Sequence, residues 1–274
     1  MKNLVFLKLG GSLITDKNKP YTTRPDKLAQ IAHEIKSALS RNPDLQLILG
    51  HGSGSFGHFA VKDHAPFLLT PTFQGNWWEK EDGWRGFSEV WYRASQLNRY
   101  VVEALHEVML PAISLPPSAL VTTENGIINH WDLTALHAVL QAGLLPVIYG
   151  DIVFDTLTGG KVLSTEALMY YLAQQLPPAK ILLAGLEAAV WADFPARFKK
   201  VDKVTPATVS YLTDKIGGSQ STDVTGGMRS KVDEMLRLVQ QIPSLSVQIF
   251  SGEESGNVVK ALSGERLGTL ISCD

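Results

Sequence analysis

The stretch Leu45-Gln-Leu-Ile-Leu-Gly-His51-Gly-Ser-Gly-Ser-Phe-Gly-His58 joins an apolar run to a glycine-rich loop. The run that starts at Leu45 predicts a buried strand. The three glycines and two serines that follow let the backbone turn tightly and approach a ligand closely. Backbone N–H groups in such a turn, at the start of a helix, form a site for an anion. One loop of this kind is weak support for a function. The chain has two more elements that combine glycine with lysine, and together they predict a phosphoryl-transfer enzyme.

Strands and helices alternate on both sides of this stretch. Helices are predicted to begin at Pro25 and near Ser55, and to cover residues 88–109, 132–142, 164–175, 227–241 and 256–262. Strands are predicted at residues 4–9, 45–50, 112–115, 145–149, 181–184, 246–250 and 268–272, with a hairpin over 151–163. Long apolar strands that alternate with helices favour an α/β fold with a mostly parallel central sheet covered on both faces, a three-layer α/β/α sandwich.

Residues 64–87 break the alternation. They combine prolines and glycines with an unusual set of aromatic residues, which predicts an irregular segment or a hairpin. The aromatic residues are Phe67, Phe73, Trp77, Trp78 and Trp84. Two interpretations stay open: a surface loop that packs its own side chains, or a lid or wall over an apolar ligand. The density of tryptophan favours the wall, because exposed aromatic side chains on a loop are costly without a partner.

Composition bounds the class of protein. The 274 residues suffice for a large α/β core, and we predict a single domain over 1–274. A net charge of −2 gives no indication of a nucleic-acid-binding surface. The single cysteine, Cys273, cannot form an intrachain disulfide. No segment is long enough to span a membrane and no long apolar signal core is present, so we expect a cytoplasmic protein.

The second glycine-and-lysine element is Lys8-Leu-Gly-Gly-Ser12, with Lys17 downstream. A strand followed by glycines suits a phosphate cradle at the carboxyl end of a parallel sheet. The spacing matches neither G-x-x-x-x-G-K-[ST] nor G-x-G-x-x-G. Lys8 lies inside an apolar strand, where a lysine needs an anionic partner. We interpret that partner as a phosphate. Lys17 by itself is typical of a solvated loop.

The third element is Thr225-Gly-Gly-Met-Arg-Ser-Lys231. Thr225 or the glycines would lie at a helix N-terminus, with Lys231 one turn into the helix. Free N–H groups and the helix dipole favour anions at that end. A plain helix cap would explain Thr225, but not the paired Gly226 and Gly227.

The two histidines of the glycine loop differ in their expected roles. His51 directly follows the strand, and we interpret it as structural. His58 is the better ligand for an anion, because a helix start would aim its side chain near the loop amides.

Two carboxylates lie close to these motifs in the predicted order. Asp151 ends a strand, and Glu166 follows Ser164 and Thr165. Either could hold Mg²⁺, directly or through water, or could orient a lysine. Glu166 could equally well be a capping residue in a first helical turn. The sequence contains no H-E-x-x-H, C-x-x-C or G-x-S-x-G pattern, so zinc hydrolysis and acyl transfer have no support. No residue is assigned as a metal ligand, and it stays open whether protein carboxylates, or only phosphates and water, hold Mg²⁺.

In their order along the chain, these motifs resemble the amino-acid kinase superfamily over nearly the whole sequence. Gly54-Ser-Phe-Gly-His58, Gly86-Phe-Ser-Glu-Val90 and Pro116-Pro-Ser-Ala119 are similar to one branch, the isopentenyl phosphate kinases. The resemblance implies ATP-dependent phosphorylation of isopentenyl phosphate to isopentenyl diphosphate, a step of isoprenoid biosynthesis, with Mg²⁺ and in a homodimer. It also implies an acceptor lobe over about 1–175 and a nucleotide lobe over about 176–274.

The resemblance further implies which residues bind the nucleotide. Backbone amides and lysines would hold its phosphates. These residues are Lys8, Gly10, Gly11, Ser12, Gly54, Gly227 and Lys231.

The acceptor side is implied in the same way. Ser53, His58 and Gly150 would hold the acceptor phosphate, and Lys17 would neutralise charge on the transferred phosphoryl group. Lys8, Lys17 and His58 would then be the catalytic residues. A phosphate acceptor is already largely ionised near neutral pH and needs no strong general base, so catalysis would consist of positioning and cationic stabilisation.

Two other functions stay open from the sequence. One is a related kinase for another small phosphonate or phosphate, of the fosfomycin-kinase type. The other is a nucleotide-binding regulatory protein without catalysis, against which the retained lysines argue. The chain departs from the superfamily pattern at Ala184-Gly-Leu-Glu-Ala-Ala-Val190, where Thr-Asp-x-x-Gly-Val is common, and at Glu166, where Asp is common.

Overall fold

The computed structural model describes residues 3–69, 77–79, 81–209 and 227–274. Within these residues the main sheet has eight strands in the order β12-β14-β13-β9-β1-β2-β6-β3. From β13 to β3 every neighbouring pair is parallel, whereas β14 pairs antiparallel with β13. The strands are β1 (Asn3–Leu9), β2 (Leu45–His51), β3 (Ala112–Ser114), β6 (Leu145–Tyr149), β9 (Lys180–Gly185), β12 (Lys203–Val204), β13 (Ser246–Ser251) and β14 (Thr269–Ile271).

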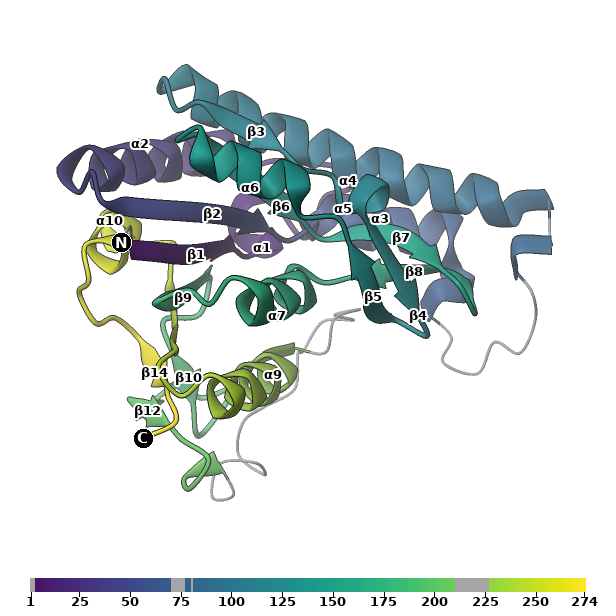
Figure 1. Ribbon diagram of the computed structural model, residues 1–274. Helices are drawn as coiled ribbons and strands as arrows, with labels where there is room; N and C mark the ends of the chain where they lie inside the picture. The colour runs from purple at the N-terminus through teal and green to yellow at the C-terminus, as the bar shows by residue number, and fades with distance from the viewer. Residues whose placement is uncertain (1–2, 70–76, 80, 210–226) are drawn as a thin grey trace.

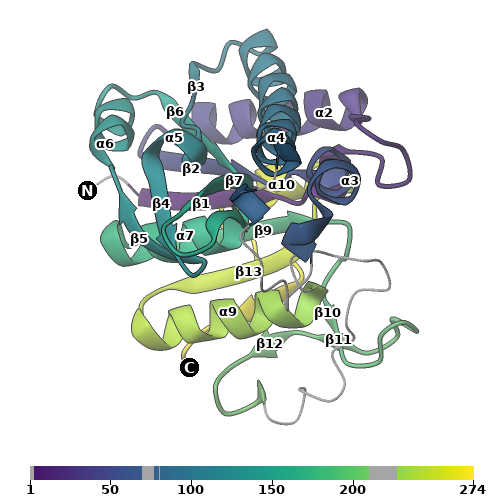
Figure 2. The ribbon, with the colours of Figure 1, turned by 90° about the vertical axis from the view of Figure 1, so that its right-hand side faces the viewer.

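Helices cover both faces of this sheet (Figures 1 and 2). Phe6 and Ile48 point to the core shared with α6, α7 and α9, whereas Leu7 and Leu49 point to the core shared with α2, α4 and α10. The alternation follows from the two-residue period of a strand. The helices are α1 (Gly11–Ile14), α2 (Pro25–Arg41), α3 (Gly54–His64), α4 (Glu81–Glu107), α5 (Pro117–Leu120), α6 (Thr134–Gln141), α7 (Thr165–Gln175), α9 (Gly227–Gln241) and α10 (Asn257–Leu262). The three-layer α/β/α prediction is confirmed.

A second, four-stranded sheet was only half predicted. Its order is β5 (Ile127–Trp131), β4 (Val121–Glu124), β7 (Asp151–Asp155) and β8 (Gly159–Leu163). The β7–β8 hairpin agrees with the prediction over 151–163, but the β4–β5 hairpin is additional. Asn125 and Gly126, with φ of 51° and 80°, form its turn. An Asn-Gly pair between short β-branched runs is a strong hairpin signal, and it is present in the sequence.

The long helix begins earlier than the sequence predicts. It was expected from Ser88, but α4 starts at Glu81 and includes Gly83 and Gly86. These glycines are typical of breaks, yet here they permit close packing. A Cβ on Gly83 would overlap the carbonyl group of Trp77, and one on Gly86 that of His64. Neither α4 nor another helix among the described residues is long and apolar enough to cross a membrane.

The aromatic segment packs into the protein. The short 3₁₀ helices η1 (Pro66–Leu69) and η2 (Trp77–Glu79) precede α4. Trp77 is buried, stacks on Phe67 with ring centroids 4.7 Å apart, and donates its Nε1–H to the Thr158 carbonyl at 2.8 Å. Phe73, from the same aromatic set, lies outside the described residues. The remaining predicted helices and strands agree with the structure to within two residues at their described ends.

Candidate active site

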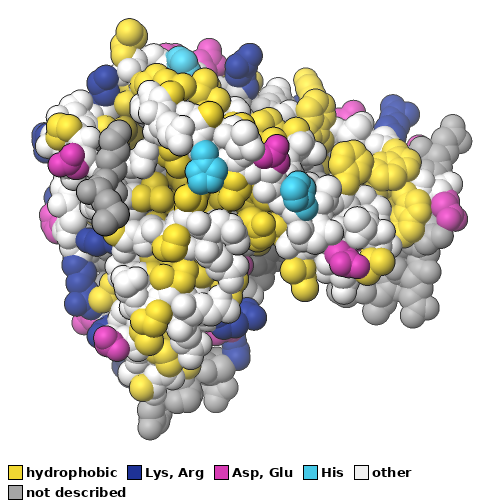
Figure 3. Space-filling model, in the orientation of Figure 1, with side chains coloured by type: hydrophobic (Ala, Val, Ile, Leu, Met, Phe, Trp, Pro, Cys, Tyr) yellow, Lys and Arg dark blue, Asp and Glu magenta, His cyan; other side chains and the backbone are white. Residues whose placement is uncertain are grey.

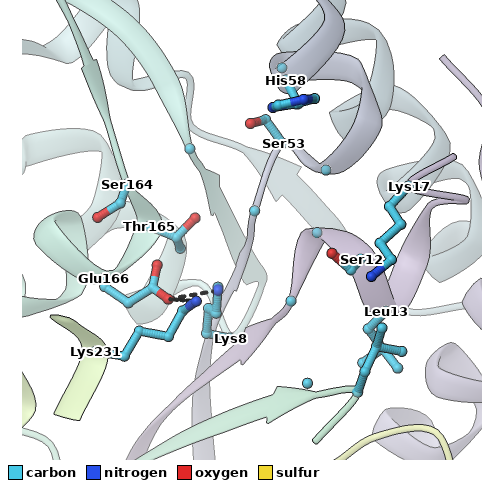
Figure 4. A pocket seen from close by; sticks show the side chains of 18 of the residues that line it. Lys8, Ser12, Leu13, Lys17, Ser53, His58, Ser164, Thr165, Glu166 and Lys231 are labelled. Carbon is cyan, nitrogen blue, oxygen red and sulfur yellow. Dashed lines mark hydrogen bonds and ion pairs between the residues drawn. The ribbon is translucent and has the colours of Figure 1, made fainter. Parts of the chain in front are cut away.

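A pocket with a volume of about 540 Å³ opens at the carboxyl ends of β1, β2 and β9 (Figure 4). This volume lies in the range typical of small-ligand sites. Every residue assigned above to the nucleotide or the acceptor lines it. They are Lys8, Gly10, Gly11, Ser12, Lys17, Ser53, Gly54, His58, Gly150, Gly227 and Lys231. The fold therefore brings together motifs that lie more than two hundred residues apart in the sequence.

The two N-terminal glycine loops touch through their backbones. A Cβ on Gly11 would overlap the Gly54 backbone, and Gly54 itself has φ of 53°. Thr15 ties the loops together, because its hydroxyl donates to the Gly11 carbonyl at 2.8 Å and accepts from the Ser55 N–H at 3.0 Å. Glycine is required at Gly11 for the close approach, and at Gly54 for the left-handed backbone as well.

Three longer helices begin at this pocket, besides the short α1, whose first residue Gly11 also lines it. Gly54 begins α3, Thr165 begins α7 and Gly227 begins α9, and all three residues line the pocket. Unpaired N–H groups and the helix dipole give each of these ends a partial positive charge. Thr225 and Gly226 precede Gly227 in the sequence and lie outside the described residues. The pocket is therefore suited to a ligand with several negative charges.

Glu166 holds two of the predicted lysines. Lys8 Nζ donates to Glu166 Oε1 at 2.8 Å, and Lys231 Nζ lies 3.9 Å from the same oxygen (Figure 4). Burial by itself would raise the pKa of the Glu166 carboxyl, but the charges of Lys8 and Lys231 outweigh burial and lower this pKa. The anionic partner of Lys8 in the structure is thus a carboxylate, and the interpretation that Glu166 orients a lysine is confirmed. The helix cap of α7 is Ser164, whose Oγ accepts from the Ala167 N–H at 3.0 Å.

Lys17 and His58 border other parts of the pocket. Lys17 is exposed and extends beside Ser12, whereas His58 lies above Ser53 (Figure 4). His58 is half-buried on the first turns of α3 and makes an edge-to-face contact with Phe59. A Cβ on the intervening Gly57 would overlap the Ser53 side chain. The pocket thus has one wall of lysines and glycines and another that carries an imidazole.

Next to His58 the pocket wall becomes apolar. Val61 from α3, Val90 and Ala94 from α4, and Val162 from β8 line this part. Val61 and Val90 also pack in one cluster with Trp77. The described aromatic residues of the segment pack on one another and do not line the pocket, so they support the apolar wall from behind and do not form it.

Known proteins resemble this chain in both sequence and fold. The model of the amino acid kinase family matches residues 3–251. The chain belongs to the amino acid kinase family. It is 34% identical to an isopentenyl phosphate kinase of Methanocaldococcus jannaschii, with 98% of each chain covered. It is 33% identical to one of Methanothermobacter thermautotrophicus, over 98% of this chain and 99% of the relative. A solved isopentenyl phosphate kinase structure superposes with a TM-score of 0.79 at 28% identity, covering 98% of this chain and all of the other.

In this amino acid kinase, His51 is a buried structural residue, as interpreted from the sequence. Asn98 Nδ2 donates to His51 Nε2 at 3.1 Å, Nδ1 lies 3.1 Å from the Gly52 carbonyl, and the ring stacks on Tyr149 with centroids 5.5 Å apart. This arrangement fits the neutral ring with its proton on Nδ1. Burial lowers the pKa of His51 to about 4, and the charge of Lys8 acts in the same direction.

The depressed pKa of His51 predicts a loss of stability in acid. The unfolded chain binds this proton at about pH 6.5, whereas the folded chain binds it only near pH 4. The contribution of His51 to the free energy of unfolding should therefore fall by about 3 kcal/mol as the pH drops from about 6.5 to about 4. Urea unfolding at several pH values measures the effect. His51→Gln is the control, and an unchanged pH dependence in that variant would contradict the assignment.

Asp151 is a buried carboxyl of the pocket wall rather than a partner of the lysines. Its Oδ2 accepts from the Ser118 N–H at 3.2 Å and its Oδ1 from the Ile152 N–H at 2.9 Å. Burial raises its pKa to about 7, although these hydrogen bonds act in the opposite direction. Nowhere in the described part of the kinase do three or more His, Cys, Asp or Glu residues gather in a way that could hold a metal ion.

Sequence reasoning missed one wall of the pocket. Glu187, Trp191, Phe194 and Arg197 all line it. Arg197 pairs with Glu187 at 2.7 Å and lies over the Phe194 ring at 4.8 Å, and Trp191 Nε1 donates to Glu187 at 3.0 Å. The available signal was position, because this loop follows the carboxyl end of β9, where open α/β sheets bind ligands.

Proposed function

We propose that this amino acid kinase transfers the γ-phosphoryl group of ATP to isopentenyl phosphate, which gives isopentenyl diphosphate. Its full-length similarity to isopentenyl phosphate kinases supports the reaction. The observation that carries the proposal is the composition of the pocket. A wall of glycine loops and lysines continues, past the half-buried His58, into an apolar wall of Val61, Val90 and Val162. A short prenyl phosphate has the same two parts, an anion and a hydrocarbon.

The nucleotide phosphates are assigned to the lysine and glycine wall. Gly11 and Ser12 offer backbone N–H groups, and Gly54 approaches from the second loop. The Gly10 N–H donates to the Ala184 carbonyl at 2.7 Å, so Gly10 lines the pocket without offering a donor. Lys8 and Lys231 add two positive charges that Glu166 holds in place. Gly227, at the N-terminus of α9, lies on the same side of the pocket as Lys231. Such an array favours the polyphosphate because helix ends and ammonium groups both neutralise negative charge.

The acceptor phosphate is assigned to Ser53, His58 and Gly150. Ser53 provides its backbone N–H and His58 donates from its ring. The Gly150 N–H already donates to the His51 carbonyl at 3.0 Å, so Gly150 lines the acceptor end of the pocket without offering a donor. The apolar wall would hold the isopentenyl group and exclude water from the site.

The transfer itself places few demands on proton chemistry. An oxygen of the acceptor phosphate forms a bond to the γ-phosphorus while the bond from that phosphorus to the β,γ-bridging oxygen breaks. No proton must be removed from an ionised phosphate, so a general base is not required. Two anions must instead be held together against their repulsion. Lys17, with Lys8, is assigned to neutralise the transferred group, because fixed cations stabilise charge that develops in the transition state.

Mg²⁺ is proposed as the ion that accompanies ATP. The pocket's donors are mainly N–H groups and lysines, which favour phosphate oxygens over a cation. The phosphates and water would therefore be its principal ligands. We also propose that the part up to about residue 175 binds the acceptor and that the part from about 176 binds the nucleotide, with Lys8 of β1 and the glycines that follow this strand, Gly10 and Gly11, at their junction.

His58→Ala should separate acceptor binding from nucleotide binding. We expect kcat/KM for isopentenyl phosphate to fall roughly a hundredfold or more, because a charge-assisted hydrogen bond to the acceptor phosphate is lost. The KM for ATP should change little. A steady-state assay with ATP, Mg²⁺ and isopentenyl phosphate measures both constants.

The matched control is His64→Ala, which removes an exposed histidine from the far end of the same helix. It should retain wild-type kinetics. Dimethylallyl phosphate and fosfomycin serve as competing acceptors. Turnover of fosfomycin alone would replace the proposal with a fosfomycin-type kinase, and ATP binding without turnover of any acceptor would indicate a protein without this activity.

A homodimer and a cytoplasmic location complete the proposal. The homodimer follows from the family resemblance, and sedimentation equilibrium of the purified chain tests it. The location follows from composition and the single cysteine, and cell fractionation tests it.

A further inference from the structure

The loop over residues 16–22, between α1 and α2, carries Lys17 to the pocket. Backbone pairing closes the base of the loop. The Asp16 N–H donates to the Thr22 carbonyl at 2.9 Å, and Thr15 and Thr23 form an isolated antiparallel β-bridge. The Asn18 N–H donates to Asp16 Oδ1 at 3.0 Å and shapes the tip. Lys17 itself is exposed, so the position of its ammonium group depends on what holds this loop.

Tyr21 fastens the returning side of the loop to two helices. The guanidinium carbon of Arg93, on α4, lies 4.2 Å from the centre of the Tyr21 ring, a cation–π distance. The ring of Phe56, on α3, meets Tyr21 edge-on with centroids 6.0 Å apart. Tyr21 has φ of 49°, a left-handed conformation that a tyrosine adopts only where its surroundings stabilise it.

The contact depends on the ring and not on the hydroxyl. Among the described residues, neither Tyr21 Oη nor Arg93 Nε has a partner in hydrogen-bonding geometry, although both atoms are buried. A buried hydroxyl without a well-formed hydrogen bond adds little to such a contact. The ring face, with Arg93 on it and Phe56 at its side, provides the attachment.

The contact between Tyr21 and Phe56 also reaches α3, the helix that carries His58, which is proposed to bind the acceptor phosphate. Phe56 lies between Gly54 and His58 on α3 and is fully buried. Tyr21 therefore links the Lys17 loop to the helix that carries His58. In the proposed reaction these two side chains must hold the transferred group and the acceptor at a fixed separation.

We propose that Tyr21, held against Arg93 and Phe56, is a positioning residue that fixes the Lys17 loop for phosphoryl transfer. The inference rests on the role proposed for Lys17. Tyr21 is not proposed to contact the substrate. An aromatic ring is required at this position, whereas a hydroxyl group is not.

Two substitutions at Tyr21 separate the ring from the hydroxyl. Tyr21→Asn removes the ring but keeps a residue that tolerates positive φ. We expect kcat to fall roughly ten- to a hundredfold with little change in KM for either substrate, because misplacement of a catalytic group by about 1 Å has effects of that size. Tyr21→Phe should retain wild-type kcat. An equal loss in both variants, or no loss in Tyr21→Asn, would overturn the proposal.

Lys17→Ala provides the background that tests whether Tyr21 acts through Lys17. In that background Tyr21→Asn should reduce kcat by no more than about twofold, because residues that act as a unit are not additive. Full additivity would show that the ring acts by another route and would overturn the assignment to Lys17.

Limited trypsin digestion tests the attachment without any kinase assay. Trypsin can cleave after Lys17, whereas Lys19 is followed by Pro20 and resists cleavage. We expect cleavage at Lys17 to be roughly tenfold faster in Tyr21→Asn than in wild type or Tyr21→Phe, because the local opening is less costly. Equal rates would overturn the proposal even if the enzyme is active. An inactive wild type with faster loop cleavage in Tyr21→Asn would instead refute the proposed function and retain the attachment.

Discussion

Lys8→Met should reduce kcat at least about a thousandfold and lower the free energy of unfolding by about 3 kcal/mol. The activity should fall because, in the proposed reaction, Lys8 would supply a fixed positive charge to the transferred phosphoryl group. The stability falls because Glu166, buried and 2.8 Å from Lys8 Nζ, is left with the more distant Lys231. Steady-state kinetics and urea unfolding measure the two effects on the same preparation.

A second substitution separates the two consequences. Adding Glu166→Gln to Lys8→Met removes the buried negative charge, so most of the lost stability should return, since neutral partners of similar shape replace a buried ion pair at little cost. Activity should not return. If the double variant regains turnover, Lys8 serves only to neutralise Glu166 and has no part in phosphoryl transfer.

Gly54→Ala should produce the second large effect, a loss of kcat/KM of roughly a hundredfold or more with a destabilisation of about 3 kcal/mol. The new Cβ would meet the Thr15 hydroxyl and lie 2.8 Å from the Gly11 carbonyl oxygen, at a residue with φ of 53°. Thr15 and Gly11 can make room for this Cβ only if the two glycine loops, which Thr15 ties together, move apart. Kinetics with ATP as the varied substrate, together with thermal unfolding, measure the result.

Gly143→Ala is the matched control for Gly54→Ala. Gly143 also has positive φ, 72°, but a Cβ there would meet no atom within 4 Å. This variant should lose only about 1 kcal/mol, the cost of the left-handed backbone, and keep full activity. If Gly54→Ala is as mild as Gly143→Ala, the close contact of the loops is not important for the site.

Much of the fold could be predicted because local patterns encode it. Apolar runs of strand length, helical spacing of leucine and valine, and glycines after strands are properties of short segments. The misassigned start of α4 shows the limit of this approach. Gly83 and Gly86 have the composition of a break, and only the packing of Trp77 and His64 against them shows that the helix continues.

The candidate site could be predicted as a set of residues but not as a geometry. The lysines and glycines were identifiable because phosphate binding needs those residue types after strands. Neither the pairing of Lys8 with Glu166, 158 residues apart, nor the stacking of Arg93 on Tyr21 has a local signature. The loop with Glu187, Trp191 and Arg197 has no residue pattern of its own, and only its position after β9 indicates a ligand site.

The sequence by itself determined the alternation of strands and helices, the glycine loops and the cationic residues of the pocket, because backbone preference and burial depend on near neighbours. Only the tertiary structure decided which charge neutralises Lys8, which cluster supports the apolar wall and what holds the Lys17 loop. These contacts depend on the order of strands in the sheet. β1 lies between β2 and β9, and that order brings the ends of distant segments to one edge.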